Sequence, residues 1–164
     1  MTDAELKLHN DEKLTEFYPV FRKKIESILT LMLAIGYRCR IQCAWRSPEA
    51  QLEAYTSGHS KLKFGLHNAT GKAGVKEALA ADIYEDPEAT HAPEKYYVAL
   101  AHFAQQVGLD TGARYSLTGK LRAAWYKATG ACDQNYLGKY GWDPSHTEEK
   151  VLSLRVKLGW RPKK

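Results

Sequence analysis

Apolar side chains recur at steps of three and four residues along the first part of the chain. The set comprises Leu14, Phe17, Phe21, Ile25, Ile28, Leu29 and Met32, and this period predicts one amphipathic helix. Pro19 must lie in or near its first turn, because proline breaks a helix interior. Gly36 is a suitable place for the helix to stop. Residues 1–13 are polar, and we expect them to be flexible.

A second pattern, with a period of two, follows this helix. Tyr37, Cys39, Ile41, Cys43 and Trp45 alternate with more polar residues, which predicts a half-buried strand. Its two cysteines are then expected to be small core residues. Same-face positions of a strand lie roughly 7 Å apart, so Cys39 and Cys43 are too far apart to share one metal ion.

Further elements follow from local signals. Ser47 before Pro48 is typical of a helix start, and that helix should run to about Ser57. The remaining predictions are a long loop over 59–78, a strand over 79–84, helices over 93–107 and 118–129, and a loop over 131–146. Segment 148–158 carries both strand and helix signals, and we favour a strand. Helices and strands without regular βαβ alternation predict an α+β fold.

Size and charge narrow the class of protein. The 164 residues and 18.5 kDa fit a single domain over 1–164. The net charge is +5, and segment 150–164 is basic without an acid, so it is either a solubilising tail or a surface for an anionic polymer such as a cell wall. The chain has no basic run interleaved with aromatic residues, so nucleic acid is not the first partner that we expect.

Three features that the sequence lacks indicate the compartment in which we expect the protein to be made. The longest strongly apolar run, Ile28–Ile35, is far too short for a transmembrane helix and is not placed like a signal peptide. The three cysteines are an odd number, which excludes a disulfide framework. We therefore expect synthesis in the cytoplasm with reduced thiols.

Two histidines stand out as candidates for chemistry. His67 and His146 lie in segments predicted to be non-helical, and each has a carboxylate at hand: Asp82 among small and apolar residues, and Asp143 three positions before His146. Two imidazoles and one carboxylate can hold zinc and leave a position for water. A further carboxylate can then act as a general base. The alternative is that these polar residues are unrelated.

A resemblance to a known family connects these residues. The stretch Ala44–Gln51, followed by Tyr55 and Gly58, resembles a segment of the zinc D-Ala-D-Ala carboxypeptidase and L-alanyl-D-glutamate endopeptidase family, which includes many bacteriophage endolysins. His67, Asp82 and an Asp143-x-x-His146 motif then follow in the order of that family. The resemblance covers about residues 40–148 and implies a small antiparallel sheet with flanking helices, of the hedgehog/DD-peptidase type.

The resemblance also implies a role for each matched residue. His67, Asp82 and His146 would hold Zn²⁺, Asp143 would be the catalytic base, and Arg46 would bind or polarise the substrate near the metal. A guanidinium suits a carboxylate or carbonyl oxygen. Three alternatives stay open: Glu148 as the base, Arg46 in a surface ion pair with Glu49, and Gln51 as a helix-packing or surface residue.

The sequence departs from the family between the first two ligands. His67 and Asp82 are 15 positions apart, well beyond the family's spacing, which implies an insertion over Ala69–Glu77. The family's serine before the histidine is replaced by Gly65, and its glycine before the aspartate by Ala78. The zinc assignment therefore requires that the insertion loops out while His67 and Asp82 stay at the sheet.

Together these observations predict a zinc-dependent hydrolase of peptide bonds in peptidoglycan stem peptides, of the phage endolysin type. We expect a monomer, with no nucleic-acid partner, that is made in the host bacterial cytoplasm and acts on the wall after release. The alternatives are a non-catalytic peptidoglycan-binding or virion module of the same fold, or a basic nucleic-acid-binding protein. Endopeptidase and carboxypeptidase activities are both compatible with the sequence.

Overall fold

The computed structural model describes residues 1–60, 62–88, 92–112 and 145–149. Within these residues the helices are α1 (Asp3–Leu14), α2 (Pro19–Ala34), α3 (Pro48–Thr56) and α4 (Glu94–Gln106). The strands are β1 (Cys39–Cys43), β2 (Ala80–Glu85), β3 (Leu109–Thr111) and β4 (His146–Glu149). Two short 3-10 turns, Leu66–Asn68 and Lys72–Gly74, lie between α3 and β2.

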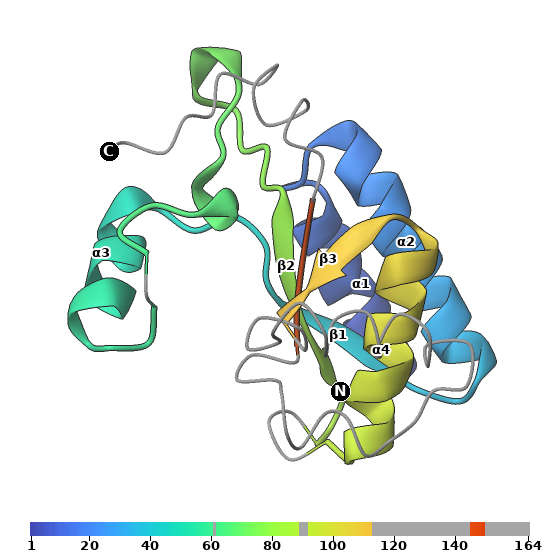
Figure 1. The fold of residues 1–164 in the computed structure, drawn as a ribbon. Helices are drawn as coiled ribbons and strands as arrows, with labels where there is room; N and C mark the ends of the chain where they lie inside the picture. The colour runs from blue at the N-terminus through green and yellow to red at the C-terminus, as the bar shows by residue number, and fades with distance from the viewer. Residues whose placement is uncertain (61, 89–91, 113–144, 150–164) are drawn as a thin grey trace.

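The four described strands form one antiparallel sheet in the order β1-β2-β4-β3 (Figure 1). The central pair, β2 and β4, joins segments that are far apart in the sequence: Asp82 lies opposite His146, and Ala80 lies opposite Glu148. The predicted α+β class with a small antiparallel sheet and flanking helices is confirmed.

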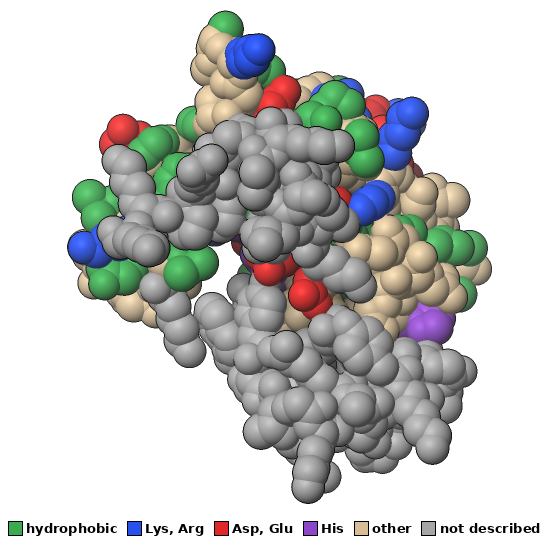
Figure 2. All heavy atoms as spheres, turned by 45° about the horizontal axis from the view of Figure 1, so that its top comes forward, with side chains coloured by type: hydrophobic (Ala, Val, Ile, Leu, Met, Phe, Trp, Pro, Cys, Tyr) green, Lys and Arg blue, Asp and Glu red, His purple; other side chains and the backbone are tan. Residues whose placement is uncertain are grey.

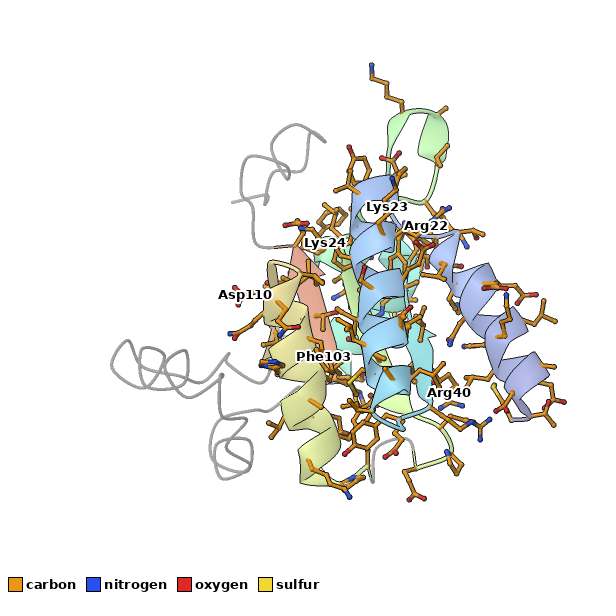
Figure 3. The ribbon with its side chains drawn as sticks, turned by 90° about the vertical axis from the view of Figure 1, so that its right-hand side faces the viewer. Arg22, Lys23, Lys24, Arg40, Phe103 and Asp110 are labelled. Atoms are coloured by element: carbon orange, nitrogen blue, oxygen red, sulfur yellow. The ribbon has the colours of Figure 1, made fainter. Side chains whose placement is uncertain are left out.

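Helices α1, α2 and α4 lie side by side over one face of the sheet (Figure 3). The core between helices and sheet contains Phe21, Ile25, Ile28 and Met32 of α2, Tyr96 and Leu100 of α4, and the strand residues Ile41 and Ile83, all buried. Each such side chain contributes about 1.5–3 kcal/mol through burial. On this face the ammonium of Lys24 lies 2.7 Å from a carboxylate oxygen of the fully buried Glu149, which ties α2 to β4.

The start of the chain differs from the prediction. Residues 3–14 form α1 rather than a flexible segment, and a separate helix α2 begins with Pro19 at its first position. The Thr2 side chain caps the new helix in a capping box with Glu5. The Asn10 side chain donates to the Cys39 carbonyl and accepts from the Ile41 N–H, at 2.8 and 2.9 Å. Asn10 thus provides hydrogen-bond partners for two backbone groups of β1. The polarity of residues 1–13 by itself does not reveal this long-range contact.

Helix α3 stands apart from the sheet (Figure 1). It begins as predicted, with the Ser47 hydroxyl accepting from the Ala50 N–H and Pro48 at the first position. Hydrophobic side chains are exposed on this lobe of the molecule (Figure 2); they include Leu52, Tyr55, Leu62 and Phe64.

Several predictions fall outside the described residues. These are the helix over 118–129, the base Asp143, Cys132, the basic segment 150–164 and most of segment 148–158. Among the helices that are described, none is long and apolar enough to cross a membrane.

Candidate metal centre

One row of residues across the sheet forms the floor of the candidate site. Asp82 on β2 lies opposite His146 on β4 and opposite Cys43 on β1. Residues directly opposite each other in antiparallel strands share a face of the sheet. Three strands therefore present a thiol, a carboxylate and an imidazole side by side.

This row faces away from the helices. Ile83 and Glu149 point into the helical layer, where Glu149 meets Lys24. Because side chains alternate along a strand, Asp82 beside Ile83 and Glu148 beside Glu149 lie on the opposite face. His146 is two positions before Glu148 and lies on that face too. The helices stabilise the sheet from one side and leave the other side for chemistry.

His67 reaches this face from the turn Leu66–Asn68. The turn is fixed to the residue before β2 by a hydrogen bond from the Leu79 N–H to the Leu66 carbonyl (3.0 Å). A second bond, from the Arg46 N–H to the His67 carbonyl (2.9 Å), fixes it to the segment after β1. The buried Asn68 side chain donates to the Arg46 carbonyl (2.7 Å) and accepts from the Gly65 N–H (2.8 Å). This role of Asn68 was not predicted from the sequence.

The three predicted zinc ligands meet in space. Nε2 of His67 lies 3.5 Å from Oδ1 of Asp82 and 3.4 Å from Nδ1 of His146, and the last two atoms are 2.9 Å apart. Three ligands about 2.0–2.1 Å from a tetrahedral zinc ion would be about 3.3 Å apart. Shifts of a few tenths of an ångström would place all three donor atoms around one such ion.

The second nitrogen of each imidazole also has a partner. Nδ1 of His67 lies 2.7 Å from the Ala44 carbonyl oxygen, and Nε2 of His146 lies 3.5 Å from a carboxylate oxygen of Glu148. A carbonyl oxygen accepts only, so Nδ1 of His67 carries the proton when the ring is neutral, and its Nε2 lone pair points to Asp82 and His146. Metal-binding histidines usually have such an acceptor behind them, so the donor set fits zinc.

Without a metal, the cluster holds protons tightly. Burial alone would lower the pKa of His146, but its hydrogen bonds to Asp82 and Glu148 raise that pKa to about 9. Burial likewise opposes the charge on His67, yet the Asp82 carboxylate raises the His67 pKa well above its ordinary value. Burial would raise the pKa of Asp82, but the two imidazoles lower it far below the usual range. In the metal-free cluster the Asp82 carboxylate thus favours the protonated form of both neighbouring imidazoles.

Arg46 completes the polar site beside the cluster. Its guanidinium lies 3.6 Å from Oδ2 of Asp82, so it faces Asp82 rather than Glu49. Its Nη1 also donates to Oε1 of Gln51 at 3.0 Å. Gln51 is only 3% exposed, and its amide donates to the Ser60 hydroxyl and the Leu62 carbonyl. Gln51 is therefore buried, and it also orients Arg46, a role that sequence analysis did not assign.

The prediction for Cys43 is wrong, whereas that for Cys39 is confirmed. Cys39 is buried against the Tyr96 hydroxyl in the helical layer. Strict alternation would put Cys43 on that same face, but the register shifts between Ile41 and Cys43. This bulge turns Cys43 to the site face, where its Sγ lies 3.6 Å from Nδ1 of His67. Cys43, His67 and Asp82 form a group of possible metal ligands whose donor atoms all lie within 4.8 Å of one another.

The insertion loops out, as the zinc assignment requires. A backbone bridge pairs Thr70 with Lys76, the Gly71 N–H bonds the Val75 carbonyl, and the Glu77 N–H bonds the Ala69 carbonyl. These bonds make Ala69–Glu77 a closed hairpin that projects from the body of the molecule (Figure 1). His67 and Asp82 consequently stay in contact despite their separation in sequence.

Comparisons with known proteins support the fold. No protein-family model matches the sequence, and no curated protein matches it. Among solved structures, the chain is similar to the L-Ala D-Glu endopeptidase ChiX of Serratia marcescens, with a TM-score of 0.55 and 16% sequence identity. The likeness covers 93% of this chain and 97% of ChiX. At this identity the likeness shows a shared fold, consistent with the α+β architecture described above.

Proposed function

We propose that this protein is a zinc-dependent peptidase that cleaves peptide bonds in the stem peptides of peptidoglycan. The observation that carries the proposal is the meeting of His67 Nε2, Asp82 Oδ1 and His146 Nδ1 within 3.5 Å of one another. Two histidines and one carboxylate with a further position open is a ligand set of catalytic zinc. The fold shared with an L-Ala D-Glu endopeptidase supports the choice of substrate.

Each residue named in this proposal has a distinct task. When bound, zinc lowers the pKa of a coordinated water and polarises a carbonyl. Arg46, held by Gln51, offers its guanidinium to a carbonyl or carboxylate oxygen of the substrate. Ala44 and Glu148 keep the two imidazoles oriented through the ring nitrogens that face away from the metal. Asp143, as the resemblance implies, accepts a proton from the attacking water and delivers it to the leaving amine.

The metal assignment is tested first. His67→Ala, Asp82→Ala and His146→Ala should each lose most bound zinc, because three protein ligands leave none to spare. The matched control is His59→Ala, which removes an exposed histidine and should keep zinc. Elemental analysis of the purified proteins measures the outcome. Near-stoichiometric zinc in all three site variants would end the assignment.

The base is tested separately from the metal. Asp143→Asn should keep zinc and lose activity by about 10²–10⁴-fold, the usual contribution of general-base catalysis. Glu148→Gln should retain most activity, because an amide oxygen can still accept from His146. Activity that survives in Asp143→Asn and is lost in Glu148→Gln would make Glu148 the base. Loss of zinc in Asp143→Asn would make Asp143 a ligand instead.

The reaction itself is tested on purified peptidoglycan. Mass spectrometry of the released products distinguishes an endopeptidase, which cuts within the stem, from a carboxypeptidase, which releases free alanine. We propose the L-alanyl-D-glutamate bond as the target and lysis after release from a phage host as the setting. A protein that binds zinc and peptidoglycan without new amino groups appearing would be a non-catalytic module. Salt-dependent gel shifts without zinc would favour nucleic-acid binding.

A further inference from the structure

We propose that Gln51 is a positioning residue that holds the Arg46 guanidinium back from Asp82 and so keeps that carboxylate available to a metal ion. Gln51 lies one side chain away from the metal ligands, because it reaches Asp82 through Arg46. The inference rests on the metal centre of the proposed function, but not on peptidase activity.

The main chain of Arg46 is fixed close to the metal ligands. Its N–H donates to the His67 carbonyl at 2.9 Å, and its carbonyl accepts from the Asn68 side chain at 2.7 Å. The side chain itself is 25% exposed. Because the backbone is held and an arginine side chain has many rotamers, the contacts of the guanidinium decide where its charge lies.

The charge of Asp82 attracts this guanidinium. Nη2 of Arg46 lies 3.6 Å from Oδ2 of Asp82, which is longer than the distance of about 2.7–2.9 Å in a charge-assisted hydrogen bond. A guanidinium can bind both oxygens of a carboxylate at once. Such a pair would occupy Oδ1, the oxygen that faces the two imidazoles. Arg46 therefore competes with a metal ion for Asp82 unless another contact restrains it.

Gln51 supplies the restraining contact. Its Oε1 accepts from Nη1 of Arg46 at 3.0 Å, whereas Cys43 offers Nη2 a sulfur atom, a weak acceptor, at 3.4 Å. The orientation of the amide is fixed, because the guanidinium can only donate and the Leu62 carbonyl can only accept. Nε2 of Gln51 accordingly donates to the Leu62 carbonyl at 2.6 Å and to the Ser60 hydroxyl at 2.9 Å.

Burial and the neutral amide suit Gln51 to this task. Its side chain is 3% exposed, and the loop that it binds is held against α3 by a hydrogen bond from the Ser60 N–H to the Ala54 carbonyl. A carboxylate at this position would neutralise the guanidinium, but an amide holds it and leaves its charge in place. Arg46 thus stays clear of the metal ligand and still attracts an oxygen of the substrate.

The experiment measures zinc affinity, by competition with a chromophoric chelator, in the parent protein, Gln51→Met, Arg46→Ala and the double variant. Methionine is similar in length but offers Arg46 no oxygen. Gln51→Met should weaken zinc binding about tenfold or more, the usual effect of losing a group behind a metal ligand. In the Arg46→Ala background the same substitution should change the affinity by no more than about twofold, as expected for independent sites.

Two further variants separate this role from a structural one. Gln51→Glu keeps a carboxyl oxygen that accepts from Arg46, so it should restore the zinc affinity lost in Gln51→Met. The matched control Glu53→Met places the same new side chain at an exposed position of α3 and should bind zinc as the parent does. Urea unfolding checks that each variant folds cooperatively, and Gln51→Leu replaces Gln51→Met if that variant does not.

Unchanged zinc affinity in Gln51→Met, or an equal loss with and without Arg46, would overturn the proposal. The second result would make Gln51 a structural support of the lobe around α3. A parent protein that binds no zinc would refute both the metal centre and this role. A protein that shows the Arg46-dependent loss of zinc but has no peptidase activity would refute the enzyme and retain the role of Gln51.

Discussion

Zinc binding to the cluster should compete directly with protons. In the metal-free protein Asp82 lies between two imidazoles, and its charge favours their protonated forms. A metal ligand must be a neutral imidazole, so binding requires that these protons leave. We therefore predict that the apparent zinc affinity rises with pH across the neutral range.

The size of the effect follows from the pKa of His146, which is about 9. Below that pKa, each decrease of one pH unit makes the neutral imidazole about tenfold rarer. This costs about 1.4 kcal/mol of zinc-binding free energy. At pH 7 the ring is then about 100-fold less available for metal than when fully deprotonated. The raised pKa of His67 adds to this effect in the same direction. Asp82 adds nothing in this range, because its lowered pKa keeps it ionised.

Competition with a zinc-sensitive fluorescent chelator at pH 6, 7 and 8 measures the slope, after correction for the protonation of the chelator. Calorimetry in buffers of different ionisation enthalpy counts the released protons. The control His59→Ala should show the same slope as the parent protein. An affinity that is flat over this range, with no proton release, would refute the view that Asp82 holds the two rings protonated.

Three further predictions test the part of the structure that holds the site. Unfolding of the metal-free protein by urea should become easier as the pH rises from 6.5 to about 9. The raised pKa of His146 stabilises the folded state fully at pH values below the ordinary histidine pKa, and this contribution is lost as the pH passes through about 9. A stability that does not change over this pH range would contradict the prediction. Asn10→Ala should cost about 1–3 kcal/mol by leaving two backbone groups of β1 without this partner, while the exposed Glu12→Ala should change little in the same urea assay. Replacement of Gly71–Val75 by Asn-Gly, a two-residue hairpin turn, should leave the melting cooperative and the zinc content unchanged, and loss of zinc would show that the hairpin supports the ligands.

The sequence by itself determined the elements whose signals are local. The period of three and four residues identified α2, because a helix core face repeats at that spacing. Ser47 and Pro48 fixed the start of α3, since capping acts within one turn. The α+β class followed from the order of these elements. The proposed metal ligands were indicated by their residue types and order, as the resemblance to a zinc peptidase family implied.

Only the tertiary structure decided which residues meet. Residues 1–13 were expected to be flexible, and α1 was missed, because the partner of Asn10 on the β1 edge is distant in sequence. The face of Cys43 was misjudged because a bulge shifts the register by one residue and so exchanges the two faces of the strand. The role of Gln51 depended on Arg46 and the loop around Ser60 folding over it. A pattern along one strand reports its alternation, but the register against neighbouring strands is fixed by contacts between distant segments, and that register brings Cys43, Asp82 and His146 into one row.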